Sequence, residues 1–247
     1  HGYWTGRGMG SFYTSCPMII SHRGVTEKFP ENTIEAYKDS LKMGFKGIEL
    51  DVLASKDGIV YCSHNHQLER ETKHQGYIHQ INSEKIDEMK TGKHSHPENQ
   101  IPIPRLTDVL EKLPYNIRLN IEIKSRSFHD LSAVRDVIEL IKGKNFINRT
   151  IISSFNPLVI WYVKWINPNV WTGFLYNNLD YFFMINVIHP DCLHTAAELV
   201  SENLVKFTKQ HGFFLNVWTV NNKPAIDWLV DLKVDGIITD QIEFLPN

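Results

Sequence analysis

From Met18 onward the sequence alternates short apolar runs with amphipathic stretches, and this alternation constrains the fold more than any other feature. The apolar runs predict buried strands, and the stretches between them repeat apolar residues at helical spacing. The clearest helix spans residues 33–43, where Ile34, Tyr37 and Leu41 share one face and Gly44 supplies a C-terminal stop. The predicted strands are 18–21, 47–52, 118–124, 150–153, 170–175, 185–189, 213–219 and 236–239, and the other predicted helices are 106–113, 131–142, 157–166, 201–210 and 223–232.

Strands that alternate with helices predict an α/β domain built around a parallel sheet. Eight strands with mostly helical connections favour a closed (β/α)8 TIM barrel, and an open doubly wound sheet is the alternative. We predict one barrel domain over residues 18–247. Residues 1–17 have no periodicity, so we interpret them as an N-terminal extension that is either native or an addition to the natural chain.

The alternation is interrupted by a long polar stretch, about 53–105, which we interpret as an insertion after the second strand. It contains Asp57-Gly58 between two apolar runs, which indicates a hairpin. If the turn is centred on Lys56 and Asp57, antiparallel pairing sets Asp51 opposite Cys62 and Glu49 opposite His64. The sequence therefore predicts that His64 lies beside two carboxylates.

Composition and charge limit the binding partners and the cellular compartment that we expect for this protein. The net charge of -2 and pI near 6.7 provide no long-range attraction to nucleic acid or to anionic membranes. No apolar run approaches the roughly 20 residues needed to span a bilayer, so we expect no stable membrane insertion. Three cysteines are too few for a disulfide framework, which favours the cytoplasm, with secretion or a periplasmic location as the alternative if a leader was removed. The oligomeric state stays open.

Three acidic residues on two predicted strands form the first candidate site. Glu49 and Asp51 are two residues apart, so both side chains project from one face of their strand. An isolated pair of this kind more often pairs with Lys or Arg, but Glu122 adds a third carboxylate from the next barrel strand. Three inward-facing carboxylates predict a site for one divalent cation with hard oxygen ligands, Mg²⁺ or Ca²⁺.

Basic and aromatic residues follow or end the predicted strands. His22 and Arg23 come directly after the first strand, at the end of a barrel where active sites are built. Arg23 can bind a phosphoryl group through two hydrogen bonds, while His22 can exchange protons near neutral pH. Lys124 shares a strand face with Glu122 and either contacts phosphate or balances the acids. Trp218 either packs against a bound glycerol or alcohol group or belongs to the core.

Taken in order, the motifs resemble those of the glycerophosphodiester phosphodiesterase family, over nearly the whole chain after Met18. The matching segments are ISHRG, PENTIEAY, GIELDV, SKDGIVYCSH, IPRL, NIEIK, SSF, VWTVN and GIITD.

The resemblance implies a phosphodiesterase barrel of the type seen in phosphatidylinositol-specific phospholipase C. It also implies metal ligands at Glu49, Asp51 and Glu122 and catalytic histidines at His22 and His64. Arg23 and Lys124 would contact phosphate. The family usually has Asp after the second histidine, where this chain has Asn65. An Asp there could orient and charge the imidazole, so Asn65 bears on the pKa of His64.

The implied reaction is metal-dependent hydrolysis of glycerophosphodiesters, small molecules such as glycerophosphocholine or glycerophosphoethanolamine, to sn-glycerol 3-phosphate and an alcohol. The nucleophile is either water or the neighbouring glycerol hydroxyl, and the preferred alcohol stays open. One alternative is a lysophospholipase D, which needs an apolar groove at the barrel mouth. Another is a metal-dependent amidohydrolase, with His64 and His66 as ligands and His189 and Asp240 as further candidates. A binding protein with a degenerate site is the third.

Overall fold

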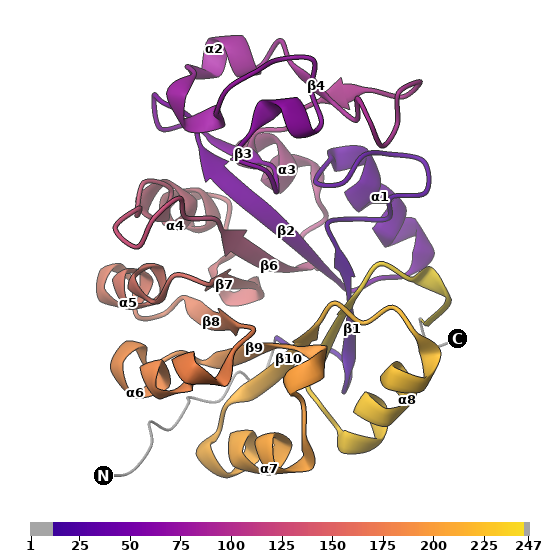
Figure 1. The fold of residues 1–247 in the computed structure, drawn as a ribbon, viewed down its shortest axis with the longest axis vertical. Coiled ribbons are helices and arrows are strands. Elements are labelled where there is room, and N and C mark those ends of the chain that lie inside the picture. The colour runs from indigo at the N-terminus through magenta and orange to yellow at the C-terminus, as the bar shows by residue number, and fades with distance from the viewer. Residues whose placement is uncertain (1–11, 245–247) are drawn as a thin grey trace.

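The computed structural model describes residues 12–244. The barrel strands are β1 (Met18–His22), β2 (Gly47–Ala54), β6 (Arg118–Ile123), β7 (Thr150–Ser154), β8 (Trp171–Tyr176), β9 (Cys192–Ala196), β10 (Phe214–Trp218) and β11 (Gly236–Thr239). They pair in parallel, and β1 pairs with both β2 and β11, which closes the barrel. Helices lie around the outside of the strands (Figure 1). The predicted (β/α)8 barrel is therefore confirmed.

Helices lie between the barrel strands, and all but α6 of those named next were predicted from the amphipathic stretches. They are α1 (Ile34–Met43), α3 (Leu106–Lys112), α4 (Val134–Gly143), α5 (Pro157–Ile166), α6 (Ile185–Ile188), α7 (Glu202–His211) and α8 (Lys223–Leu232). Helix α1 shows why helix ends could be predicted from the sequence. At its N-terminus the Thr33 hydroxyl caps the helix by accepting a hydrogen bond from the Ala36 amide. At its end Gly44 adopts a left-handed conformation. No helix in the described part of the chain is long and apolar enough to cross a membrane.

One predicted strand, residues 185–189, is wrong. Residues Ile185–Ile188 form the short helix α6, and the strand in this part of the barrel is β9, Cys192–Ala196. Burial explains the error, because Ile185 and Ile188 are buried three residues apart while Asn186 and Val187 are exposed. All of β9 is buried, including the polar His194, so its mixed composition did not resemble an apolar strand.

The insertion after β2 packs around a small apolar core of its own. It contains β3 (Val60–Cys62), α2 (Ser83–Ile86), the two-stranded pair β4 (Lys90–Thr91) and β5 (Ile101–Pro102), and the 3-10 helices η1 (Leu68–Arg70) and η2 (Ile78–Gln80). Its buried cluster includes Leu53, Tyr61, Leu68 and Met89. This segment lies beside α1 at one end of the barrel (Figure 1).

The predicted hairpin exists, but its predicted register is wrong by one residue. Val52, not Asp51, pairs with Cys62. The loop has three residues, because the Ser55 amide donates to the Ile59 carbonyl at 2.8 Å and Gly58 takes a left-handed φ of 87°. The turn is thus centred on Asp57. The Ser63 amide still donates to the Asp51 carbonyl at 3.0 Å, so the residue before His64 lies directly against the acidic strand.

Three further 3-10 helices cover the barrel ends and connections, η3 (Ile147–Arg149), η4 (Leu179–Met184) and η5 (Ala197–Leu199), and a fourth, η6 (Ile242–Phe244), follows the last strand. Residues 1–11 of the predicted N-terminal extension lie outside the described residues. Phe12 is buried with Met18 and Ile20. Tyr13 donates a hydrogen bond from its hydroxyl to Asn216 Oδ1 at 3.0 Å.

Candidate active site

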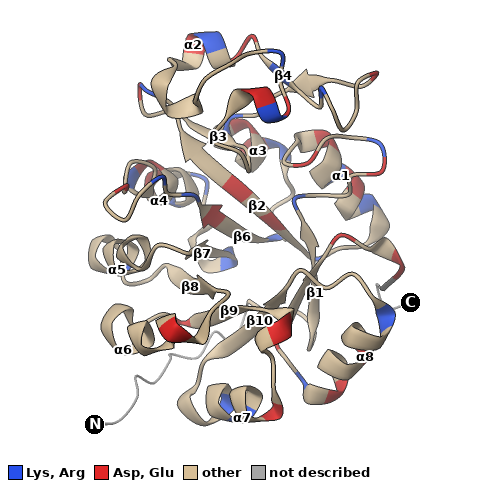
Figure 2. Cartoon of the chain, viewed as in Figure 1, with Lys and Arg blue, Asp and Glu red and all other residues tan. Residues whose placement is uncertain are grey.

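The acidic residues of the barrel gather on two adjacent strands, β2 and β6, and no other described barrel strand carries Asp or Glu. Figure 2 shows this acidic pair of strands in the barrel. Asp51 pairs with Glu122 across the β2–β6 ladder, and Glu49 lies two residues earlier on the same face of β2. One carboxylate oxygen from each lies within 4.8 Å of the others, and all three residues are buried.

Two cations lie against this acidic cluster. Arg23 Nε lies 3.0 Å from Asp51 Oδ2, and its Nη1 lies 3.0 Å from Glu31 Oε2. Lys124 Nζ lies 2.8 Å from Glu122 Oε1 and 3.5 Å from Asp51 Oδ1. Both residues expected to bind phosphate are therefore at the site, where they also offset part of the negative charge. Asp51 Oδ1 is buried and accepts no hydrogen bond.

The electrostatics of the three carboxylates differ. Burial, together with repulsion from Asp51 and Glu122, raises the pKa of Glu49 well above its usual value. Burial and the charge of Asp51 also raise the pKa of Glu122. Burial acts in the same direction on Asp51, but Arg23 and Lys124 outweigh it and lower the pKa of that residue. Three buried acids with two cations leave a deficit of positive charge.

A bound divalent cation would balance the remaining negative charge of the three carboxylates. The donor set is three carboxylates with no thiolate or imidazole, which suits a hard ion such as Mg²⁺ or Ca²⁺. Asp51 Oδ1, which accepts no hydrogen bond and lies 3.5 Å from Lys124 Nζ, is an available ligand atom inside the cluster. Among the described residues this is the single group of acids, histidines or cysteines close enough to hold a metal, and it contains neither His64 nor His66. The ligand set of the amidohydrolase alternative is therefore not brought together.

Asn32 fixes the position of Asp51 and was not identified from the sequence. Its Nδ2 donates to Asp51 Oδ2 at 2.9 Å, and its Oδ1 accepts from the Asp51 amide at 3.0 Å. The Tyr37 hydroxyl also donates to Asn32 Oδ1 at 3.0 Å. Asn32 takes a left-handed φ of 57°, a conformation that Asn tolerates better than most residues. Its place in the PENTIEAY motif was the available signal.

His22 ends β1 and is held by a carboxylate from the other end of the chain. Its Nδ1 lies 2.7 Å from Asp240 Oδ1, directly after β11. Asp240 Oδ2 accepts from Asn221 Nδ2 at 2.6 Å, which fixes the carboxylate in turn. Burial alone would raise the pKa of Asp240, but the hydrogen bond from His22 outweighs burial and lowers that pKa. An aspartate that holds Nδ1 leaves Nε2 available for proton transfer.

His64 follows β3 in the insertion and is partly buried. Burial lowers the pKa of His64 to about 4, Asp51 opposes this shift, and Arg23, Lys124 and His22 reinforce it. These interactions place His64 near the same charged groups as His22. The hairpin therefore brings His64 to the acidic cluster despite the shifted register, and Asn65 lines a small cavity beside it together with Glu31 and Asn32.

Trp218 lies at the end of β10, where it packs partly against a buried cluster of the barrel. Its indole Nε1 donates to the His194 carbonyl at 3.0 Å, which anchors it structurally. Its ring meets Phe155 edge to face with 5.4 Å between ring centroids. Phe155 follows β7 and is 42% exposed. Trp218 is thus anchored in the wall but close to exposed aromatic surface at the barrel mouth.

Comparison with known proteins identifies the family. Residues 22–244 match the model of the glycerophosphoryl diester phosphodiesterase family. The chain belongs to this family. A glycerophosphodiester phosphodiesterase from Caldanaerobacter subterraneus subsp. tengcongensis is 34% identical over 234 residues, which cover 93% of this chain and 96% of that protein. The predicted family and its enzymatic activity, hydrolysis of glycerophosphodiesters, are therefore confirmed.

Solved structures share the same fold. A glycerophosphodiester phosphodiesterase from Thermotoga maritima is 27% identical with a TM-score of 0.74, covering 94% of this chain and 97% of that one. A phosphodiesterase from Oleispira antarctica, solved in complex with the product sn-glycerol-3-phosphate, has a TM-score of 0.83 at 23% identity and covers 95% and 96% of the two chains. The second likeness is evidence for the barrel fold alone.

Proposed function

We propose that this chain hydrolyses small glycerophosphodiesters to sn-glycerol 3-phosphate and an alcohol at the cluster formed by Glu49, Asp51 and Glu122. The observation that carries the proposal is the convergence of those three buried carboxylates with Arg23, Lys124 and the two histidines. The match to the glycerophosphoryl diester phosphodiesterase family model and the 34% identical relative support the choice of substrate. The free thiols of Cys16, Cys62 and Cys192 support a cytoplasmic location.

The three carboxylates would hold one Mg²⁺ or Ca²⁺ ion. When bound, such an ion supplies Lewis-acid polarisation of a phosphoryl oxygen. Arg23 and Lys124 lie on the same cluster and would share the negative charge of the phosphoryl group. Arg23 is held by Asp51 and Glu31, so its guanidinium is oriented before substrate binds.

The histidines would carry the proton transfers. His22 Nε2 takes the proton of the attacking water or of the neighbouring glycerol hydroxyl, while Asp240 at Nδ1 stabilises the imidazolium that forms. His64 gives a proton to the departing alcohol oxygen as its bond to phosphorus breaks. Burial lowers the pKa of His64, and a bound anionic diester would act in the opposite direction and favour the protonated imidazole that this role needs.

The test is release of glycerol 3-phosphate from glycerophosphocholine by the purified chain, before and after removal of metal with EDTA. We expect activity to be lost with EDTA and restored by Mg²⁺ or Ca²⁺ added separately, which also identifies the ion. Full activity in EDTA would contradict the metal site. Phosphorus NMR distinguishes attack by water from attack by the glycerol hydroxyl, because the second route passes through a cyclic glycerol phosphate.

Single variants test the histidine roles. His22→Ala and His64→Ala should each lower kcat by roughly 10²- to 10⁴-fold, the usual contribution of a general acid or base, with little change in KM. His94→Ala is the matched control, because His94 is an exposed loop residue of the same insertion as His64. A double variant of His22 and His64 with near-normal kcat would refute the assignment.

A further inference from the structure

The helices around the barrel differ in charge. Helices α1, α3, α4, α7 and α8 each carry three or four charged residues, whereas α5 carries Lys164 alone and α6 carries none. In Figure 2 α5 is drawn almost wholly in tan, while charged positions mark α4, α7 and α8. A helix that meets water normally has a polar outer face, and a helix that is apolar on all sides is normally buried. The α5–α6 side of the barrel therefore has the composition of a covered surface.

Two tryptophans form an exposed ridge on α5. Trp161 and Trp165 are 47% and 65% exposed, and their rings are stacked with 6.3 Å between centroids and 5° between planes. Tyr162 stacks on Trp165 at 5.8 Å, and Arg135 Nε donates to the Tyr162 hydroxyl at 2.6 Å. The rings hold one another in place, so a partner that covers them would cost them little conformational freedom.

A hollow of about 430 Å³ lies beside this ridge, between α5 and α6. Besides the two indoles, its lining includes Pro168 after α5 and Val187 on α6, which is 56% exposed. Lys164 also lines it, and its ammonium group forms an ion pair with the buried Asp191. The ridge and the hollow together are called the α5–α6 patch below. Its surface is apolar and carries one charge that is already balanced.

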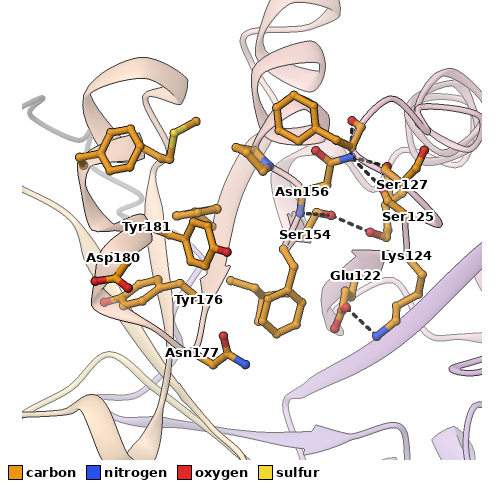
Figure 3. A pocket seen from close by; sticks show the side chains of 18 residues that line it. Glu122, Lys124, Ser125, Ser127, Ser154, Asn156, Tyr176, Asn177, Asp180 and Tyr181 are labelled. Carbon is orange, nitrogen blue, oxygen red and sulfur yellow. Dashed lines mark hydrogen bonds and ion pairs between the residues drawn. The ribbon is translucent and has the colours of Figure 1, made fainter.

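The patch lies on the side of the barrel, toward the end opposite the candidate active site. Helices of a (β/α)8 barrel run antiparallel to its strands, so Trp165 and Pro168 lie toward the amino ends of the strands. Figure 3 shows the other end, where Glu122 and Lys124 lie across a cavity of about 600 Å³ from Tyr181. Among the described residues that line this cavity, none belongs to the patch. A molecule on the patch would leave the active-site opening free.

We propose that the α5–α6 patch is a homodimer interface, against which a second copy of this chain packs its own patch about a two-fold axis. In such a contact each surface must complement itself. The patch does so in shape, because the Trp161–Trp165 ridge of one copy can enter the hollow of the other. It also does so in charge, because Lys164 is paired with Asp191 within its own chain and like charges do not repel across the axis.

The exposed area is of the size that a dimer needs. A Trp side chain offers about 250 Å², so Trp161 and Trp165 leave roughly 280 Å² to be covered. A stable dimer buries about 800 Å² on each subunit, so the two indoles supply about a third of it. Val187 and Pro168 extend the apolar surface beside them. The centre of a protein interface is depleted in charge and enriched in Trp, as this patch is.

A lipid surface is the competing occupant, and two observations disfavour it. The net charge of -2 provides no attraction to an anionic bilayer, and the one cation of the patch, Lys164, is paired with Asp191. A bilayer on the patch would also lie away from the opening beside the acidic cluster. A second copy requires neither a cation nor access to that opening.

Sedimentation velocity of the purified chain tests the proposal. Interfaces of standard size associate in the micromolar range or below, so we expect a dimer at about 100 μM chain. Trp165→Glu and Val187→Glu each bury an unpaired carboxylate in the contact, so each should raise the dissociation constant of the dimer at least about 30-fold. Trp228→Glu is the matched control, because Trp228 is 42% exposed on α8 and lies outside the patch. It should leave the dissociation constant unchanged.

Two further measurements show that the variants remain folded. Trp165 and Val187 are mostly exposed, so the monomer should tolerate both changes, and Trp165→Ser is a milder second variant. We expect kcat/KM for glycerophosphocholine to stay within about twofold in every variant, because the patch lies away from the opening. Thermal unfolding of each variant provides the second check.

Several outcomes would overturn the proposal. The first is a monomer at about 100 μM chain. The second is a dimer that persists in all the patch variants, because another face would then form it. Flotation with phosphatidylcholine vesicles tests the competing occupant, and binding of a monomer that depends on Trp165 would replace the second copy by a lipid surface. A monomer whose thermal stability falls in Trp165→Ser, but not in Trp228→Ser, would show that another part of the same chain covers the ridge.

Discussion

Replacing Asp240 by Asn changes one group in the contact that holds His22. Asp240 Oδ2 accepts from Asn221 Nδ2 at 2.6 Å. Asn221 cannot reverse its amide without loss, because its Oδ1 accepts from the Asp240 amide at 3.0 Å and from Thr239 Oγ1 at 3.1 Å. In Asp240→Asn the new amide oxygen should therefore face Asn221, and the new NH₂ group should face His22 Nδ1, now 2.7 Å from Asp240 Oδ1.

That arrangement reverses the tautomer of His22. With an amide NH₂ donating to Nδ1, the ring proton moves to Nε2, which can then no longer accept the proton of the nucleophile. Loss of a general base lowers kcat by roughly 10²- to 10⁴-fold, equivalent to about 3–5 kcal/mol of transition-state stabilisation. KM should change little, because Asp240 is not expected to contact the substrate.

Steady-state release of glycerol 3-phosphate from glycerophosphocholine measures both constants, and thermal unfolding checks that the variant is folded. Asp227→Asn is the control, because Asp227 is an exposed α8 residue that pairs with Lys223. A folded Asp240→Asn variant with kcat within about threefold of the parent would show that His22 does not depend on this carboxylate for its protonation state.

Two further predictions concern stability. Gly173→Ala should lower the free energy of unfolding by about 1–3 kcal/mol, because the added Cβ would lie 2.4 Å from His194 Nε2. Gly143→Ala on α4 is the control. A Cβ there would have no atom within 4 Å, so this change should be neutral or stabilising by up to about 1 kcal/mol. Chemical denaturation measures both, and equal effects would contradict the packing argument. Asp130→Asn should destabilise the protein by about 1–2 kcal/mol at pH 7. Burial alone would raise the pKa of Asp130, but hydrogen bonds from Arg126 and Ser132 outweigh burial and lower it, so the ionised carboxylate stabilises the fold. The lowered pKa of folded Asp130 stabilises the protein fully above the unfolded value near 4, and this contribution is lost progressively as the pH falls below 4 toward the folded-state pKa. The difference in stability between the two proteins should therefore shrink between pH 4 and pH 2, and a constant difference from pH 7 to pH 2 would refute the cause.

Local sequence patterns were enough to predict much of the fold and of the candidate site. The two-residue spacing of Glu49 and Asp51 on a strand, and of Glu122 and Lys124 on the next barrel strand, was enough to predict that these side chains share one face. Asp57-Gly58 predicted the hairpin that brings His64 to the acids, although loop length, which the pair alone does not specify, shifted the register. The prediction failed at residues 185–189, where a short apolar run fits a helix as well as a strand.

What the sequence by itself determined, then, was set by neighbours along the chain: strand faces, helix ends and the hairpin. The tertiary structure alone decided the contacts between distant residues, such as Asp240 on His22 and Asn32 on Asp51. It also decided the cavity, whose walls come from separate strands and from η4. The physical reason is that a side chain's partners across a closed barrel depend on register and closure, and these are fixed by the packing of the whole chain.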